Sequence, residues 1–282
     1  MTAWKKGLLM LSAMMLSAVM LLSPGTGRAE EPDQLLGRPM PDFTAACVDG
    51  TTFTLSEALR EKELVLVNFW ATWCGWCRVE FPMLEEAYNK YKDRVAVIGL
   101  SVSETDTPEI IRDFAGEYSL TFPMAPFWER KQLQMVTEEL RVTGYPTTFV
   151  VDRSGSIVFM EVGSMPSAAL FSGVFDALLS PDRKTGDVLT EAPGLPEGAL
   201  QLLFIRNDFS PVAGVNVSLT VDGSVYPFVS DEHGSIFSSH EPGAVSEIRI
   251  DQIPDGLELL SEEPMILDAG GRLLLYPVDF VQ

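Results

Sequence analysis

Basic residues are scarce in this sequence of 282 residues. It has 20 Lys and Arg against 40 Asp and Glu, so its formal net charge is −20 at pH 7. A surface of this sign repels phosphate backbones and anionic lipid headgroups, which argues against nucleic acid as a partner. We interpret the acidity mainly as a means of keeping the protein soluble, and a preference for basic protein partners is the alternative.

Cysteine and histidine are also rare, with three of the first and two of the second. A closed tetrahedral zinc site needs four ligands of these kinds. The closely spaced Cys74 and Cys77 supply two, and the histidines, His233 and His240, lie far away in another part of the sequence. We therefore expect no metal site and no other cofactor. We interpret the remaining cysteine, Cys47, as a small buried apolar residue, with a regulatory or intermolecular thiol as the alternative.

Long hydrophobic runs are absent as well. The N-terminal apolar run, residues 7–22, is shorter than the roughly 20 residues that a membrane-spanning helix needs. It follows Lys5 and Lys6 and precedes a plausible cleavage point after Ala29. We predict that residues 1–29 are a cleaved signal peptide, or an uncleaved anchor that tethers the protein to a membrane through the apolar run. The remaining chain is expected in the periplasm or another extracytoplasmic compartment.

Strand-like and helix-like patterns alternate over residues 35–180, which indicates an α/β layer structure. Leu64–Trp70 is apolar almost throughout, as expected for a central strand that is buried on both faces. A helix is predicted from Cys74 to about Asp93. Further strands are expected at Phe43–Cys47, Thr51–Phe53, Val95–Val102, Thr147–Asp152 and Ile157–Val162, and further helices at Ser56–Glu63, Thr107–Tyr118, Phe127–Val142 and Ser167–Leu179.

The composition changes near residue 181. Residues 181–198 hold prolines and glycines among polar residues, which is typical of a linker. Over residues 199–282, short alternating segments are separated by turn signals such as Asp222-Gly223, which predicts a small all-β sandwich domain. Its strands are expected at Leu202–Ile205, Val215–Val221, Val225–Val229, Glu247–Ile253 and Leu273–Tyr276.

Cys74 and Cys77 lie where the buried strand passes into a helix. A helix start presents unpaired backbone N–H groups and the positive end of the helix dipole, which favour a thiolate. We predict that Cys74, the outer residue, is a nucleophile and that Cys77, on the same helix face, resolves the mixed disulfide. Glu80 lies a further turn along and is a candidate to accept the proton of Cys77. A solvated surface glutamate is the alternative, and the spacing alone does not decide between them.

Tyr145 and Pro146 stand just before a predicted strand, where proline is tolerated. A cis bond there would pack a turn against the two cysteines, whereas a trans turn is the alternative. We expect the substrate-binding surface around the cysteines to consist of Trp73, Trp76, Tyr145 and Pro146.

In this order and spacing, the motifs resemble the TlpA/ResA-like thiol–disulfide oxidoreductases of the thioredoxin superfamily. The resemblance covers about residues 35–180 and includes Gly37-Arg-Pro-Met-Pro-Asp-Phe, Val67-Asn-Phe-Trp-Ala-Thr-Trp-Cys-Gly-Trp-Cys, Glu80-Phe-Pro and Gly144-Tyr-Pro-Thr-Thr-Phe. It implies a thioredoxin fold, with a central mixed sheet flanked by helices, a cis Tyr145–Pro146 bond and a Glu80 that tunes the cysteines. Residues 199–282 more loosely resemble carboxypeptidase regulatory-like (transthyretin-like) sandwiches through Pro211-Val-Ala-Gly-Val-Asn-Val.

The resemblance also implies an enzyme that reduces disulfides in protein substrates, often in cytochrome c maturation, and that a membrane protein of the DsbD/CcdA type re-reduces. Two departures matter. Thioredoxin has a buried Asp where this chain has Asn68, which shifts proton handling toward Glu80. The Gly75-Trp76 dipeptide replaces a proline-containing pair, which leaves the direction of electron flow open. A dithiol oxidase or isomerase, a thiol peroxidase and a binding module centred on the β-sandwich domain are the alternatives.

Overall fold

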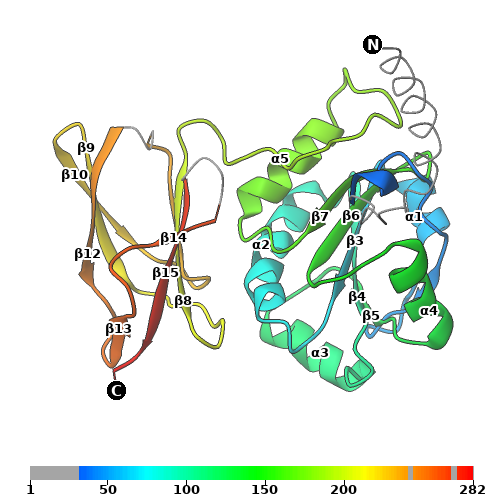
Figure 1. Cartoon of the computed structure of the whole chain (residues 1–282), viewed down its shortest axis with the longest axis horizontal. Coiled ribbons are helices and arrows are strands. Elements are labelled where there is room, and N and C mark those ends of the chain that lie inside the picture. Colours follow the sequence, from blue (N-terminus) through cyan, green and yellow to red (C-terminus); the bar gives the residue numbers. More distant parts are fainter. Residues whose placement is uncertain (1–31, 241–243, 268–271, 282) are drawn as a thin grey trace, which may run out of the picture. The chain divides into compact units, whose positions relative to one another are not determined.

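The computed structural model describes residues 32–240, 244–267 and 272–281 of the chain (Figure 1). The expected signal peptide or anchor at residues 1–29 lies outside these residues. Within the described ranges, no helix has both the length and the apolar character to cross a membrane. From Leu35 onward the chain forms one compact unit, which contains an α/β region followed by an all-β region.

A five-stranded mixed sheet organises the α/β region, in the strand order β5-β4-β3-β6-β7. The central strand β3 is parallel to β4 and antiparallel to β6. A separate antiparallel hairpin, β1–β2, precedes this sheet in the chain. The strands are β1 (Thr44–Ala46), β2 (Thr52–Thr54), β3 (Leu64–Trp70), β4 (Val95–Ser101), β5 (Met124–Pro126), β6 (Thr147–Asp152) and β7 (Ile157–Val162).

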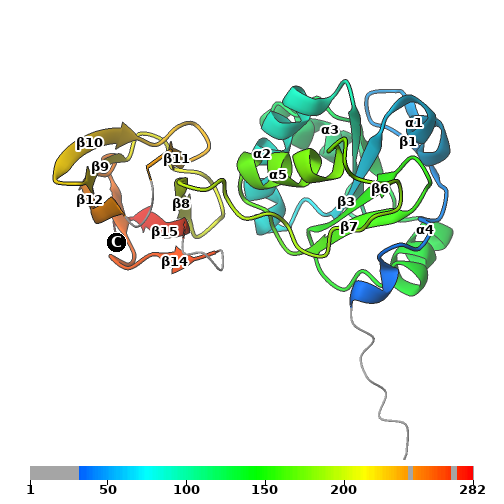
Figure 2. The same ribbon diagram turned by 90° about the horizontal axis from the view of Figure 1, so that it is seen from above.

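Helices cover both faces of this sheet (Figure 1 and Figure 2). Successive side chains of a strand point to opposite faces, so Leu66 of β3 is buried among residues of α2, α3 and α5, and Val67 among residues of α1 and η2. The predicted central strand that is buried on both faces is therefore confirmed. The helices are η1 (Pro32–Leu35), α1 (Leu55–Glu61), α2 (Gly75–Tyr91), α3 (Pro108–Glu117), α4 (Arg130–Gln134), η2 (Met135–Glu139) and α5 (Ala168–Leu178).

The main difference from the sequence prediction lies between α3 and β6. The helical stretch expected over Phe127–Val142 becomes helical only at Arg130. The preceding strand β5 is not predicted at all, because three residues are too short for a periodic pattern to register.

In the described residues of the all-β region the strands form two sheets, as the alternating sequence pattern indicates. In the first, β8 (Leu200–Arg206) lies between β11 (Ser235–Ser238) and β15 (Leu273–Phe280), and β15 also pairs with β13 (Leu257–Leu259) and β14 (Met265–Ile266). In the second, β9 (Asn216–Val221) lies between β10 (Ser224–Val229) and β12 (Val245–Gln252). Apolar side chains of both sheets share one buried cluster. The short strands β11, β13 and β14 are not predicted from the sequence.

Residues 181–198, predicted as a linker, contain no helix or strand but make specific bonds to the α/β region. The N–H of Leu189 donates to the carbonyl of Val158 at 2.7 Å, and the N–H of Gly186 donates to the carboxylate of Asp152 at 2.7 Å. Burial alone would raise the pKa of Asp152, but hydrogen bonds from Ser154 and Gly186 outweigh it and hold that pKa below its usual range. The segment is thus fixed along the edge of the α/β region.

Two glycines in turns of the all-β region differ in how closely other atoms pack against them. Gly234 and Gly223 both have a left-handed backbone, with φ of +68° and +79°. A Cβ on Gly234 would lie 2.3 Å from the carbonyl oxygen of Phe204, whereas nothing lies within 4 Å of a Cβ on Gly223. We expect Gly223→Ala to lower the free energy of unfolding by about 1 kcal/mol, the cost of the backbone conformation. We expect Gly234→Ala to cost about 3 kcal/mol or more, because the backbone of β8 must also shift.

Urea unfolding of the two variants and the wild type, followed by far-ultraviolet circular dichroism, measures these costs. Gly223→Ala is the matched control, since it carries the same backbone penalty without the steric clash. Equal losses in the two variants would contradict the close packing of Gly234 on β8.

Candidate functional site

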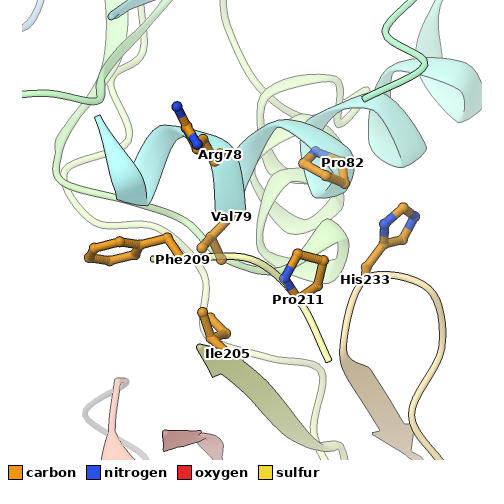
Figure 3. Close-up of a pocket in the computed structure, with 7 residues that line it drawn as sticks. All are labelled: Arg78, Val79, Pro82, Ile205, Phe209, Pro211 and His233. Carbon is orange, nitrogen blue, oxygen red and sulfur yellow. The ribbon is translucent and has the colours of Figure 1, made fainter. Parts of the chain in front are cut away.

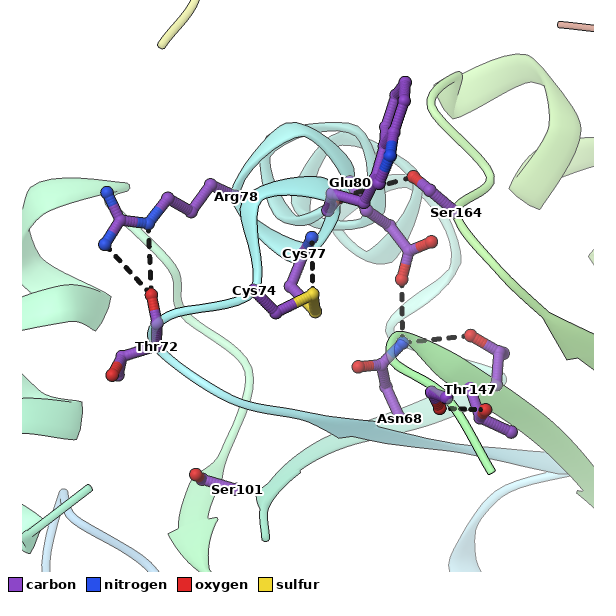
Figure 4. Close-up of a disulfide and its surroundings, with 12 residues drawn as sticks. Asn68, Thr72, Cys74, Cys77, Arg78, Glu80, Ser101, Thr147 and Ser164 are labelled. Atoms are coloured by element: carbon purple, nitrogen blue, oxygen red, sulfur yellow. Dashed lines mark hydrogen bonds between the residues drawn. A yellow bond between two sulfur atoms is a disulfide. The ribbon is translucent and has the colours of Figure 1, made fainter. Parts of the chain in front are cut away.

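The disulfide between Cys74 and Cys77 lies at the start of α2 (Figure 4). Cys74 is the N-cap residue, and its Sγ accepts a hydrogen bond from the backbone N–H of Cys77 at 3.2 Å. Cys74 is 6% exposed and Cys77 is fully buried. The predicted order, with Cys74 outside and Cys77 beneath it, agrees with this geometry. The opening through which solvent reaches Cys74 is small.

The loop that carries Cys74 is fixed from two sides through Thr72. The buried carboxylate of Asp106 accepts hydrogen bonds from the N–H and the hydroxyl of Thr72 at 2.8 and 2.6 Å, and from the hydroxyl of Ser101 at 2.5 Å. From α2, the guanidinium of Arg78 donates to the carbonyl of Thr72 at 3.1 and 2.9 Å (Figure 4). Asp106 is not predicted from the sequence, because it follows a different strand and no local pattern links it to Cys74.

Glu80 lies one helical turn beyond Cys77 and is fully buried. Its carboxylate accepts hydrogen bonds from the side-chain amide of Asn68 at 2.8 Å and from the N–H of Met165 at 2.7 Å. Figure 4 shows this carboxylate on the side of α2 that faces β3. Burial raises the pKa of Glu80 to about 7, although the bonds from Met165 and Asn68 oppose that rise. The alternative of a solvated surface glutamate is therefore wrong.

Asn68 of β3 holds Glu80 in place. Its amide nitrogen donates to Glu80 and to the hydroxyl of Thr148, at 2.8 and 2.9 Å. Its amide oxygen is buried and has no hydrogen-bond partner among the described residues. A side-chain amide does not ionise near neutral pH, so the group of this pair that can gain or lose a proton is Glu80.

The four residues predicted to bind substrate occupy different environments. Trp73 is 64% exposed, and its ring packs edge-on against Tyr145 with 6.0 Å between the ring centroids. The Tyr145–Pro146 peptide bond is cis. Trp76 is half-buried and contacts Phe209 of the all-β region instead, with 5.4 Å between the centroids. Trp73 and Tyr145 are thus brought together, and Trp76 packs against a different part of the chain.

Cys47 is a buried free cysteine at the end of β1. Burial raises the pKa of its thiol above the ordinary value, and a hydrogen bond with Thr51 opposes the rise only in part. A thiol with a raised pKa is a poor nucleophile near neutral pH. The interpretation of Cys47 as a small buried residue agrees with its position.

The raised pKa of Glu80 predicts a pH-dependent loss of stability. Because the folded protein holds this proton more tightly than the unfolded chain, the stabilisation is fully present below about pH 4.5 and is lost as the pH rises to 7 and beyond. Glu80→Gln removes this effect. Between pH 5 and pH 8 we expect the free energy of unfolding of the wild type to fall by roughly 2–3 kcal/mol relative to that of the variant.

Urea unfolding of both proteins at pH 5 and pH 8 gives this difference, and it cancels the contributions of the other titrating groups. Both proteins are kept oxidised so that the thiols of Cys74 and Cys77 do not titrate. If the two proteins respond equally to pH, Glu80 is ionised alike in the folded and unfolded states, and the assignment fails.

Comparison with known proteins places these residues in a family. The model of the Redoxin family matches residues 35–178. Among curated proteins, the thioredoxin-like protein YneN of Bacillus subtilis (strain 168) is 36% identical over 130 residues, which covers 46% of this chain and 72% of that protein. The thiol-disulfide oxidoreductase ResA of Bacillus anthracis is 32% identical over 143 residues, which covers 50% of this chain and 78% of that protein.

Among solved structures, a thiol:disulfide interchange protein of the thioredoxin family from Chlorobium tepidum TLS is 29% identical. The match covers 50% of this chain and 96% of that chain, with a TM-score of 0.45. The Redoxin match includes Cys74, Cys77 and Glu80, and it ends before the all-β region. The chain therefore belongs to the Redoxin family, as a TlpA/ResA-like thiol–disulfide oxidoreductase of the thioredoxin superfamily.

Proposed function

We propose that this protein is exported and reduces disulfides in protein substrates through Cys74 and Cys77. The observation that carries the proposal is the position of Cys74 at the N-cap of α2, where its sulfur accepts the N–H of Cys77. In the reduced protein, the same N–H and the positive end of the helix dipole favour a thiolate at Cys74. The thiolate is the form of cysteine that attacks disulfides.

The reaction transfers two electrons from the enzyme to the substrate. The Cys74 thiolate attacks one sulfur of the substrate disulfide, which forms a mixed disulfide and releases the other substrate sulfur as a thiolate. Cys77 then loses its proton and attacks the sulfur of Cys74. This step closes the Cys74–Cys77 disulfide and releases the second substrate thiolate.

Glu80 is the proposed acceptor of the proton from Cys77. Cys77 is fully buried, so its proton needs an internal acceptor. A carboxyl group with a pKa of about 7 both accepts and returns protons near neutral pH. The hydrogen bonds from Asn68 and Met165 fix the orientation of this carboxyl group one turn below Cys77.

The proposed docking surface for substrate combines Trp73, Tyr145 and Pro146. Trp73 is the most exposed large apolar side chain near the disulfide, and it contacts Tyr145. Aromatic groups with one free face offer a large contact area at a low cost in side-chain entropy.

The proposed domain boundaries are residues 35–180 for a thioredoxin-like domain, 181–198 for a linker and 199–282 for a β-sandwich of the carboxypeptidase regulatory-like type. The buried cluster shared by the two C-terminal sheets supports a sandwich. Residues 1–29 are proposed to act as a signal peptide or membrane anchor that delivers the enzyme to the periplasm or another extracytoplasmic compartment. A membrane protein of the DsbD/CcdA type is the proposed electron donor, and cytochrome c maturation is the candidate pathway.

Single cysteine variants test the proposed reaction. We expect Cys74→Ser to reduce insulin no faster than the background, because serine cannot attack a disulfide. We expect Cys77→Ser to attack but not to release its substrate, so that a mixed disulfide with insulin accumulates. Turbidity from precipitated insulin chains measures turnover, and mass spectrometry of the non-reduced protein detects the adduct.

Cys47→Ala is the control for this experiment and should retain wild-type turnover. Turnover that survives in Cys74→Ser, or an adduct that maps to Cys47, would rule out Cys74 as the nucleophile.

A further inference from the structure

One turn of the all-β region lies against the segment between the two redox cysteines. This turn, residues 206–211, follows β8 and is closed by its own hydrogen bonds. The N–H of Arg206 donates to the carbonyl of Ser210, and the N–H of Phe209 donates to the carbonyl of Arg206, both at 2.9 Å. The carboxylate of Asp208 accepts the N–H and the hydroxyl of Ser210 at 3.0 and 2.6 Å. These bonds define the shape of the turn.

Phe209 stands in this turn with a φ of 65°. A left-handed backbone is unfavourable for a residue with a side chain, and such conformations occur where the surrounding structure imposes them, often at functional contacts. The hydrogen bonds that Arg206 and Asp208 make with Phe209 and Ser210 supply that constraint. The sequence thus keeps a large aromatic residue at a position where glycine or asparagine would be less strained.

The ring of Phe209 fills the space beside Gly75. A Cβ on Gly75 would lie 2.1 Å from the Cδ2 atom of that ring. Gly75 is the first residue of α2, and its φ lies outside the left-handed region, so its backbone conformation is open to any residue. The absence of a side chain at position 75 is therefore explained by the ring of Phe209.

The contact extends along α2. The Phe209 ring also packs edge-on against Trp76, and Ile205 belongs to the same buried cluster as Val79 of α2. Figure 3 shows Phe209 and Pro211 facing Val79 across a shallow cleft. The contact is thus a small apolar interface between the turn and the redox helix.

This interface makes the two flanks of Cys74 different. On one flank, Trp73 is exposed beside Tyr145. On the other, Gly75 and Trp76 lie under Phe209. Cys74 itself is only 6% exposed. A substrate sulfur can therefore approach Cys74 from the side of Trp73, whereas Phe209 covers the approach from the side of Trp76.

We propose that the turn formed by residues 206–211 is a substrate-selectivity element of the enzyme. It covers the Gly75–Trp76 flank, so that Cys74 accepts disulfides carried on a narrow, extended segment that enters along Trp73 and Tyr145. Disulfides set in a broad folded surface, such as those of insulin, are reduced with a lower kcat/KM. This role rests on the disulfide exchange proposed above, and it gives the all-β region a direct part in choosing the substrate.

The ratio of kcat/KM for insulin to kcat/KM for glutathione disulfide tests this role. The disulfides of insulin lie in a folded protein, whereas the disulfide of glutathione disulfide joins two small peptides. We expect Phe209→Ala to raise the ratio by about threefold or more, because the covered flank opens to the larger substrate. Phe237→Ala, which removes an exposed phenylalanine of the all-β region away from the contact with α2, is the control and should leave the ratio unchanged.

A ratio that stays the same or falls in Phe209→Ala would overturn the selectivity role. If Phe209→Ala only damaged the folded structure, kcat/KM would fall equally for both substrates and the ratio would stay unchanged, so this result counts against the role. A wild type that reduces neither disulfide would instead defeat the proposed function, and this outcome is distinguishable because it involves no variant.

The contact itself is tested by a double-mutant cycle on unfolding. Gly75→Ala alone should lower the urea midpoint, because the new methyl group collides with Phe209. In the Phe209→Ala background, the same change should be neutral or should raise the midpoint, since alanine is favoured over glycine in a helix. Strictly additive effects would show that Phe209 does not occupy the space beside Gly75, and the inference would fall with the contact.

Discussion

The hydrogen bond from the N–H of Cys77 to the sulfur of Cys74 is the interaction on which the rest of the site depends. A helix leaves its first N–H groups without partners inside the helix, and a side-chain oxygen at the N-cap usually accepts one of them. Here the redox sulfur is the acceptor. The Sγ atom of Cys74 therefore caps α2, and the same hydrogen bond would stabilise the negative charge of the proposed Cys74 thiolate.

This arrangement works only if the loop before α2 holds Cys74 at the N-cap. Asp106 and Arg78 provide that constraint through opposite ends of Thr72, its N–H and its carbonyl. Burying the carboxylate of Asp106 would be costly without partners, and its three hydrogen bonds with Thr72 and Ser101 compensate for this. Asp106 thus stabilises the loop whose position determines the orientation of the Cys74 sulfur.

The sequence predicts the parts of this site that are encoded locally. The buried run Leu64–Trp70, the spacing of Cys74 and Cys77, and the proline before β6 are all contiguous patterns, and each is placed correctly. The burial of Glu80 is not decided by its spacing from Cys77, because that burial depends on Asn68 and on the N–H of Met165, which lies 85 residues further on.

The same reason explains what the sequence does not reveal. Asp106, in the loop after β4, accepts hydrogen bonds from Thr72. Phe209 contacts Gly75 from a region that is predicted only as strands and turns. Helical periodicity identifies the face of α2 on which a residue lies, but not which element covers that face. Nothing in the sequence near Gly75 indicates that the ring of Phe209 fills the space beside it.

The buried pair of Cys77 and Glu80 suggests why the two cysteines act in a fixed order. They lie one turn apart on α2, and both are shielded from water. Two negative charges at that separation in a medium of low dielectric constant oppose each other, so ionising both groups at once is unfavourable. In the proposed reaction, Cys77 therefore stays a thiol beneath the Cys74 thiolate until the mixed disulfide has formed. The proposed transfer of the Cys77 proton to Glu80 accompanies the attack on the mixed disulfide, so that the resolving step follows the capture of a substrate.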